Sequence, residues 1–184
     1  MTHTSANWPS DVFILIPAYK AADSLATFLP QVLSIAPAKN ICVIDDGSHD
    51  ETENVCRQFG ILFTSLSVNC GKGRALTTGF DFLQKEHNAS WILTMDADGQ
   101  HAVSDIPLFL TAIKQAHNCG IIIGKRDMKP GTMPLARILS NTLTSRILTI
   151  ATGSKIPDSQ CGYRAYSTSF LKTVSCCYPR FEME

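Results

Sequence analysis

The chain has 184 residues, of which 45% are hydrophobic and 17% are charged. This length suits one compact domain with a sizeable core, and the apolar share argues against an intrinsically disordered chain. Sixteen basic residues balance sixteen acidic ones, so the formal net charge is zero. A neutral chain lacks the basic surface of a dedicated nucleic-acid-binding protein, and we expect no nucleic-acid partner.

The seven cysteines are odd in number and include no CxxC zinc pair. The first ten residues lack the basic start and apolar centre of a signal peptide. No run reaches the roughly 18 uninterrupted apolar residues of a spanning helix. We therefore expect a soluble, cytoplasmic protein with reduced cysteines.

Short apolar runs alternate with longer amphipathic stretches, which is typical of βα units around a mostly parallel sheet. The first run, 12–16, is rich in β-branched residues, and Pro17 is expected to end it. Further buried strands are expected at 41–44, 61–64, 91–95 and 121–123. Helices are expected at 22–34, 52–59, 74–86 and 106–117. The pattern predicts a single α/β domain with helices flanking the sheet.

This alternation weakens beyond Gly124. Residues 125–134 are basic, contain two prolines and a glycine, and are predicted to form a loop that moves. Residues 135–152 are predicted to form a helix with a broad apolar face, flanked by Arg137 and Arg146. Two interpretations remain open: a helix packed on the core, or a helix that contacts a lipid surface.

Polar segments follow the predicted strands, at the edge where ligands bind to open parallel sheets. These segments are PAYK at 17–20, DDGS at 45–48, NCGKG at 69–73 and DADGQH at 96–101. Their convergence on one edge predicts a ligand site there.

Asp96 and Asp98 are separated by one residue where the chain leaves a predicted strand. Mg²⁺ and Mn²⁺ prefer oxygen ligands, and Mg²⁺ usually takes one or two protein carboxylates plus substrate phosphates. The alternative is simple turn chemistry, because Asp-Gly is a common turn pair. The preceding strand and the acidic pair upstream favour a cation site.

The DDGS segment combines structural and functional features. Ser48 followed by Glu51 predicts a capping box for the next helix, and Gly47 permits a tight turn. Neither feature accounts for two adjacent aspartates. We expect Asp46 to accept hydrogen bonds from the edge of a nucleotide base.

The NCGKG segment precedes a helix, where backbone donors and Lys72 can meet a phosphate. A simple glycine-rich entry to the helix is the alternative. The segment is not a Walker A loop, and Leu76 stands where a dinucleotide-binding fingerprint has glycine or alanine. A P-loop NTPase and a dehydrogenase are therefore disfavoured.

A last polar cluster, DSQCGYR, occupies 158–164. Arg164 and Arg126 are candidates to neutralise a diphosphate, and surface arginines are the alternative. His101 is expected to ligate a metal, to orient a carboxylate, or simply to enter a helix.

These motifs, in this order, resemble the family 2 glycosyltransferases with the GT-A fold. The resemblance covers 12–184 and is strongest to the dolichyl- or polyprenyl-phosphate sugar transferases. It implies an inverting transferase that moves a sugar from GDP-mannose or a UDP-sugar to a polyprenyl phosphate, with Mg²⁺ or Mn²⁺. The implied domain is 11–184, preceded by a disordered or extended arm at 1–10. The helix at 135–152 resembles one that such enzymes place against the cytoplasmic face of a membrane.

The resemblance also implies roles for individual residues. Those implied to bind the nucleotide sugar are Pro17, Ala18, Tyr19, Asp46, Lys72, Asp96 and Arg164. Asp96 and Asp98 are implied to hold the cation, with Gln100 beside the sugar. Those implied to face the acceptor phosphate are Arg126, Arg137 and Ser140. A hydroxyl acceptor would need a base, for which Asp158, Glu182 and Glu184 remain open.

The chain departs from the family pattern in two places. Ala21 stands where relatives usually carry an acidic residue, and the chain stops at Glu184 where they usually continue, so we expect a truncated domain. Three alternatives stay open: a saccharide acceptor in cell-surface polysaccharide synthesis, a nucleotidyltransferase, and an inactive nucleotide-sugar binding module. A nucleotidyltransferase usually has a basic, glycine-rich loop after its first strand, which PAYKAADS lacks.

Overall fold

The computed structural model describes residues 8–116, 119–125, 144, 146, 147, 149, 150, 153, 158 and 161–174. Within this part, six strands form one sheet in the order β3-β2-β1-β4-β6-β5. The strands are β1 (Val12–Ala18), β2 (Ile41–Asp45), β3 (Leu62–Ser65), β4 (Trp91–Thr94), β5 (Ile121–Ile123) and β6 (Arg164–Ser167). Strands β3, β2, β1 and β4 run parallel, whereas β6 is antiparallel to both β4 and β5.

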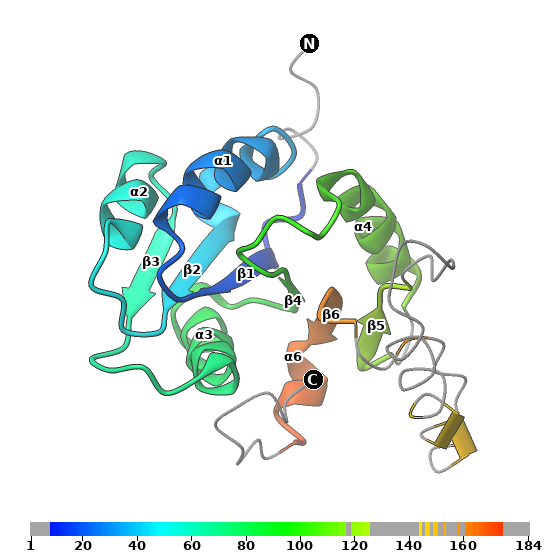
Figure 1. Cartoon of the computed structure of the whole chain (residues 1–184). Helices are drawn as coiled ribbons and strands as arrows, with labels where there is room; N and C mark the ends of the chain where they lie inside the picture. The colour runs from blue at the N-terminus through cyan, green and yellow to red at the C-terminus, as the bar shows by residue number, and fades with distance from the viewer. Residues whose placement is uncertain are drawn as a thin grey trace, which may run out of the picture.

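Helices cover both faces of the sheet (Figure 1). The described helices are α1 (Ala22–Leu33), α2 (Thr52–Gln58), α3 (Lys72–His87), α4 (Ile106–Gln115) and α6 (Thr168–Leu171), with short 3₁₀ turns η2 (Ala38–Asn40) and η3 (Val103–Asp105). One core cluster joins the sheet to α1, α2 and α4, and a second joins it to α3 and α6. The predicted α/β fold with a mostly parallel sheet is confirmed.

The residues of β1 alternate between the two core clusters. Ile14 and Ile16 belong to the cluster under α1, and Phe13 and Leu15 belong to the cluster under α3. All four are at most 4% exposed. Burial on both faces explains why this run is apolar without interruption.

Pro17 does not end β1, as the sequence predicted, because the strand continues to Ala18. The Met95 N–H donates to the Leu15 carbonyl and the Asp46 N–H donates to the Ala18 carbonyl. Backbone groups alternate in direction along a strand, so Pro17 faces β4 beyond the last paired residue there. Its missing N–H therefore removes no ladder hydrogen bond.

The predicted capping box is wrong. The Ser48 hydroxyl donates to Asp45 Oδ1 at 2.5 Å, and no side chain caps α2 at Glu51. Asp50 instead accepts from the N–H of Thr52 at 3.2 Å and from its hydroxyl at 2.6 Å. The buried Asp45 carboxylate draws Ser48 away from the helix, and an Asx-type turn takes over the entry.

The predicted helix at 135–152 is described only in part. Thr144, Arg146, Ile147, Thr149 and Ile150 are helical. Ile147 and Ile150 are 57% and 84% exposed. The rest of this segment, most of the loop at 125–134 and the first seven residues lie outside the described residues. Among the helices that are described, none has the length and hydropathy needed to cross a bilayer.

Candidate functional site

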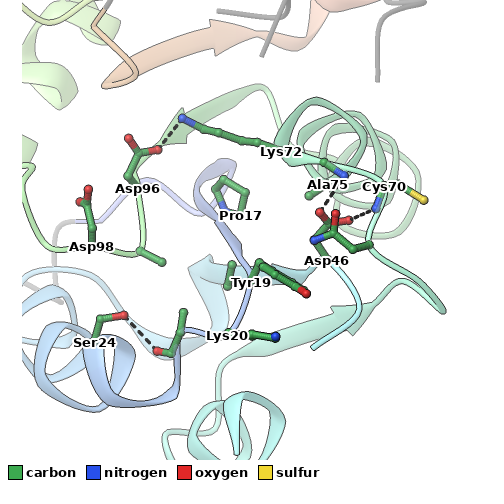
Figure 2. Close-up of a pocket in the computed structure, with 15 residues that line it drawn as sticks. Pro17, Tyr19, Lys20, Ser24, Asp46, Cys70, Lys72, Ala75, Asp96 and Asp98 are labelled. Atoms are coloured by element: carbon green, nitrogen blue, oxygen red, sulfur yellow. Dashed lines mark hydrogen bonds and ion pairs between the residues drawn. The ribbon is translucent and has the colours of Figure 1, made fainter. Parts of the chain in front are cut away.

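A pocket of about 780 Å³ lies at the carboxyl ends of β1, β2 and β4, beside the start of α3. Seven of the residues proposed from the sequence line it: Pro17, Ala18, Tyr19, Asp46, Lys72, Asp96 and Asp98. Figure 2 shows Asp96 and Asp98 on one side of the pocket and Tyr19 and Asp46 on the other. The expected convergence of polar segments on one edge of the sheet is confirmed.

The turn after β1 is held by the segment after β2. The Lys20 N–H donates to Ser48 Oγ at 2.7 Å, and the Ala21 N–H donates to Thr52 Oγ1 at 3.1 Å. Lys20 has φ +50°, a left-handed conformation that is uncommon for lysine. Its ammonium lies 5.3 Å from the centre of the Tyr19 ring, within cation–π range. The half-exposed Tyr19 ring is therefore presented to the pocket on a tethered turn.

The two aspartates after β2 have different partners. Asp45 is buried and accepts from the Ser48 hydroxyl, the Ser48 N–H and the Ser65 hydroxyl. Asp46 is also buried, and it accepts from the N–H groups of Cys70 at 2.8 Å and Gly71 at 2.7 Å. Asp45 thus fixes the end of the sheet, and Asp46 anchors the loop that leads into α3.

Gly47 makes this anchoring possible. It has φ +73°, and a Cβ atom there would lie 2.6 Å from the Val68 carbonyl carbon. Only glycine combines this backbone angle with so close an approach. The loop at 68–71 can therefore lie against the end of β2, within reach of the Asp46 carboxylate.

Lys72 and Asp96 form an ion pair across the pocket. Lys72 Nζ lies 2.7 Å from Asp96 Oδ1, and the two side chains are 20% and 31% exposed. Lys72 is the first residue of α3 and follows Gly71, whose φ is +93°. The Asp46 anchor and the positive φ of Gly71 together aim the start of α3 at the acidic loop (Figure 2).

The acidic loop after β4 folds back on itself. The Asp96 N–H donates to His101 Nδ1 at 3.1 Å, and the Gln100 N–H donates to Asp98 Oδ1 at 2.9 Å. Gly99 supports the turn with φ +71°. Of the expectations for His101, orientation of a carboxylate-bearing residue is the one that these contacts support.

Aromatic rings support this loop from behind. His101 stacks on Tyr163 with 4.8 Å between ring centres, and Tyr163 packs on Phe109 of α4 at 4.5 Å. Burial, followed by the charges of Asp105 and Cys161, raises the pKa of the Tyr163 hydroxyl far above its usual value. Tyr163 therefore remains a neutral packing residue at any physiological pH.

The acidic loop fits a cation whose remaining coordination positions are filled by a bound substrate. Asp96 and Asp98 both line the pocket, but no group of three His, Cys, Asp or Glu side chains suited to a metal occurs in the described part of the chain. One or two carboxylates are the usual protein contribution when substrate phosphates complete the shell of Mg²⁺. The donor set does not fit a metal held entirely by protein.

Other predicted site residues do not line this pocket. Arg164 is 7% exposed at the start of β6 and donates from Nε to the Cys161 carbonyl at 2.7 Å. It borders a small adjoining void together with Lys72 and Asp96. Asp158 is fully buried, and Gln100 is exposed on the acidic loop. Outside the described residues lie Arg126, Arg137, Ser140, Glu182 and Glu184.

Ser24, Asn69, Cys70 and Ala75 also line the pocket but were not assigned a role from the sequence. Ser24 lies in the first turn of α1, four residues after the PAYK segment. Its position near the carboxyl edge of the sheet could therefore have been predicted from the sequence. Asn69 and Cys70 stand inside the NCGKG motif. Ala75 lies one turn beyond Lys72, and helical periodicity alone places it on the same face.

Comparison with known proteins identifies the family of this chain. Residues 13–175 match the family described as Glycosyl transferase family 2. A UDP-N-acetylglucosamine–dolichyl-phosphate N-acetylglucosaminyltransferase of Methanococcus voltae is 30% identical, over 89% of this chain and 72% of that protein. An undecaprenyl-phosphate mannosyltransferase of Micrococcus luteus is 27% identical, over 89% of this chain and 69% of that protein.

The fold is also found among solved structures. Glucosyl-3-phosphoglycerate synthase of Mycobacterium tuberculosis, crystallised with Mn²⁺, UDP and glucosyl-3-phosphoglycerate, matches with a TM-score of 0.67. It is 16% identical, over 90% of this chain and 59% of that one, so the likeness concerns the fold. The chain spans about half to seven tenths of the length of curated relatives that it matches. The family match over nearly the whole chain, with a relative at 30% identity, shows that this protein is a glycosyltransferase of family 2 with the GT-A fold.

Proposed function

We propose that this enzyme transfers a sugar from a nucleotide diphosphate sugar to a polyprenyl phosphate, with inversion at the anomeric carbon. The observation that carries the donor half is the pocket itself, which places the Tyr19 ring and Asp46 on one side and the carboxylates of Asp96 and Asp98 on the other. The relatives named for dolichyl-phosphate and undecaprenyl-phosphate transfer support the acceptor half. Contact with the cytoplasmic face of a membrane follows from such an acceptor.

The arrangement of side chains in the pocket suits a nucleotide diphosphate that lies along it. We place the nucleoside against Tyr19, Pro17 and the loop held by Asp46, whose carboxylate oxygens keep lone pairs for a base edge. The diphosphate then lies between Lys72 and the acidic loop. Lys72 would release Asp96, its present partner at 2.7 Å, and donate to phosphate oxygens instead.

Asp96 and Asp98 would hold a Mg²⁺ or Mn²⁺ ion at the diphosphate. When bound, such a cation supplies Lewis-acid stabilisation of the negative charge on the leaving nucleotide. Lys72 and Arg164 add positive charge on the same side, and Gln100 is proposed to lie beside the transferred sugar. Arg126, Arg137 and Ser140 are proposed to bind the acceptor phosphate.

The acceptor decides whether the enzyme needs a general base. A phosphate oxygen is already anionic, so transfer to a polyprenyl phosphate requires no proton removal. A sugar hydroxyl must lose a proton, and the buried Asp158 would then be the candidate among the described carboxylates. The proposal therefore gives Asp158 no part in transfer to a lipid phosphate.

The test is a transfer assay with GDP-mannose, UDP-glucose and UDP-N-acetylglucosamine. Each donor is incubated with Mn²⁺, Mg²⁺ or EDTA and with either a short polyprenyl phosphate or a soluble sugar. We expect one donor to yield a glycosylated polyprenyl phosphate in the presence of metal, with the product lost in EDTA. Product on the soluble sugar alone would overturn the lipid acceptor. Binding of a donor without any transfer or hydrolysis would indicate a binding module.

A further inference from the structure

The Asp96 peptide lies just beyond the last backbone hydrogen bond between the β4 segment and β1. Strand β4 ends at Thr94, and the Met95 N–H still reaches back to the Leu15 carbonyl. The Asp96 N–H is the first past the sheet, and it donates to His101 Nδ1 at 3.1 Å. A partly buried backbone N–H needs an acceptor. At Asp96 the His101 side chain supplies the acceptor that a strand carbonyl supplies to Met95.

His101 is itself fixed in orientation. Its side chain is 12% exposed, and its ring lies at 7° to the plane of the Tyr163 ring. Because Nδ1 accepts a hydrogen bond, the neutral ring carries its proton on Nε2, 3.8 Å from Asp96 Oδ2. The stack keeps Nδ1 toward the Asp96 peptide and Nε2 toward its carboxylate.

The stacked rings of His101 and Tyr163 connect the acidic loop to strand β6. Tyr163 directly precedes Arg164, the first residue of β6. The Tyr163 hydroxyl donates to the Ala102 carbonyl at 3.4 Å, one residue beyond His101. The spacing between the acidic loop and Arg164 is therefore set by ring packing as well as by the pairing of β4 with β6.

We propose that His101 is a positioning residue: it holds the Asp96 peptide through Nδ1 so that the carboxylate faces the pocket, and it couples this loop to Tyr163. The inference rests on the proposed function, because it concerns the readiness of Asp96 to bind a cation with a nucleotide. Partners that orient a ligating residue in this way typically change metal affinity by about 10- to 100-fold when they are removed.

The alternative is that His101 only packs, and two substitutions separate the roles. His101→Phe keeps a ring for Tyr163 but removes the acceptor. His101→Asn loses the ring but places an amide oxygen near the position of Nδ1. A packing role predicts that phenylalanine is tolerated better, whereas a positioning role predicts that asparagine is. Tyr163→Phe, which keeps the stack, is the matched control.

The first readout needs no ligand. In amide hydrogen exchange, we expect the Asp96 N–H to exchange at least about tenfold faster in His101→Phe than in the wild-type protein. We expect protection to persist in His101→Asn and Tyr163→Phe. Should the phenylalanine variant unfold, His101→Gln replaces it, because glutamine moves the acceptor toward the position of Nε2.

The second readout is calorimetric affinity for Mn²⁺ in the presence of UDP or GDP. We expect about tenfold weaker binding in His101→Phe, and binding within about threefold of wild type in His101→Asn. Equal binding by the wild type and the phenylalanine variant, or equal loss in both folded variants, would overturn the role of His101. A wild-type protein that takes up no Mn²⁺ with either nucleotide would instead overturn the proposed function, and with it the purpose of the positioning.

Discussion

Lys72 Nζ lies 2.7 Å from Asp96 Oδ1, so an internal ammonium group sits on the carboxylate that we assign to the cation. Both groups line the pocket, and both are only partly exposed. In the proposed reaction, Lys72 exchanges this partner for the donor diphosphate when the nucleotide and cation enter together. The ion pair therefore belongs to the ligand-free protein, and we expect it to break when the donor binds.

Replacement of Lys72 by methionine is expected to move two affinities in opposite directions. Without the ammonium, Mn²⁺ alone should bind about tenfold more tightly, corresponding to ~1.4 kcal/mol for a partly screened charge close to the cation. The affinity for UDP or GDP should fall by a similar factor, because a phosphate contact is lost. Calorimetry with Mn²⁺ alone measures the first affinity, and calorimetry with UDP or GDP at saturating Mn²⁺ measures the second.

Lys85→Met is the matched control for this experiment. Lys85 lies on the same helix, and its replacement removes the same charge. Its partner, however, is Asp81 at the exposed surface. Lys85→Met should leave both affinities unchanged. If Lys72→Met weakened Mn²⁺ binding, the idea that Lys72 competes with the cation would be wrong.

Asp46→Asn is expected to destabilise the protein more than Asp45→Asn. Asp46 faces two backbone N–H groups, which cannot turn away from an amide NH₂. Two of the three donors to Asp45 are serine hydroxyls, which can rotate and accept instead. We expect a loss of about 1–3 kcal/mol in the free energy of unfolding for Asp46→Asn, measured in urea.

Nucleotide binding should follow the same order. Asp46→Asn frees the loop that carries Cys70 and Gly71, and it thereby moves Lys72. Asp45→Asn should leave the affinity of the folded protein for UDP or GDP close to that of the wild type. Equal unfolding free energies and equal affinities for the two variants would contradict the anchoring role of Asp46.

The buried Cys42 thiol makes stability depend on alkaline pH. Burial, and then the neighbouring Cys56, raises the pKa of Cys42 from 9.0 to about 12. The unfolded chain therefore loses this proton at a lower pH than the folded chain, so the free energy of unfolding falls as the pH rises from 9 toward 12. The stabilising contribution is fully present below pH 9.

Urea unfolding between pH 8 and pH 10.5 measures this dependence. Cys42→Ala should lower stability at pH 8 by removing buried atoms, but it should show a shallower decline above pH 9. Cys119→Ala, a change at an exposed cysteine, should keep the wild-type slope. A wild-type slope in Cys42→Ala would show that other groups cause the decline.

Most of the sheet was predictable because strands buried on both faces leave a clear apolar signal. The runs at 41–44 and 91–95 correspond closely to β2 and β4, whose residues are almost all buried. The runs at 61–64 and 121–123 correspond to β3 and β5, which were expected to be buried but lie at the two ends of the described sheet and are only partly buried. Strand β6 was missed, since Arg164–Ser167 reads RAYS and contains polar residues that are nevertheless buried. Its antiparallel direction depends on the long-range pairing with β4, which local patterns do not encode.

The site was predictable from the rule that polar segments gather at the carboxyl ends of parallel strands. The rule identified Asp46, Lys72, Asp96 and Asp98 as neighbours, but it carried no information on their partners. The binding of Asp46 to the loop at Cys70 and Gly71 depends on Gly47, whose left-handed backbone brings that loop close. The stack of His101 on Tyr163 joins residues 62 positions apart, so only the folded chain reveals it.

The central claim is a nucleotide site that works with a cation held by Asp96 and Asp98. The direct measurement is the thermal midpoint with a panel of GDP- and UDP-sugars, with and without Mn²⁺, for the wild type and for Asp98→Ala. A ligand at about 100 times its dissociation constant adds ~2.7 kcal/mol, which raises the midpoint by several degrees in a domain of this size. We predict such a rise for one donor, only with Mn²⁺ and only in the wild type. A rise that is independent of Mn²⁺, or that persists unchanged in Asp98→Ala, would contradict the account.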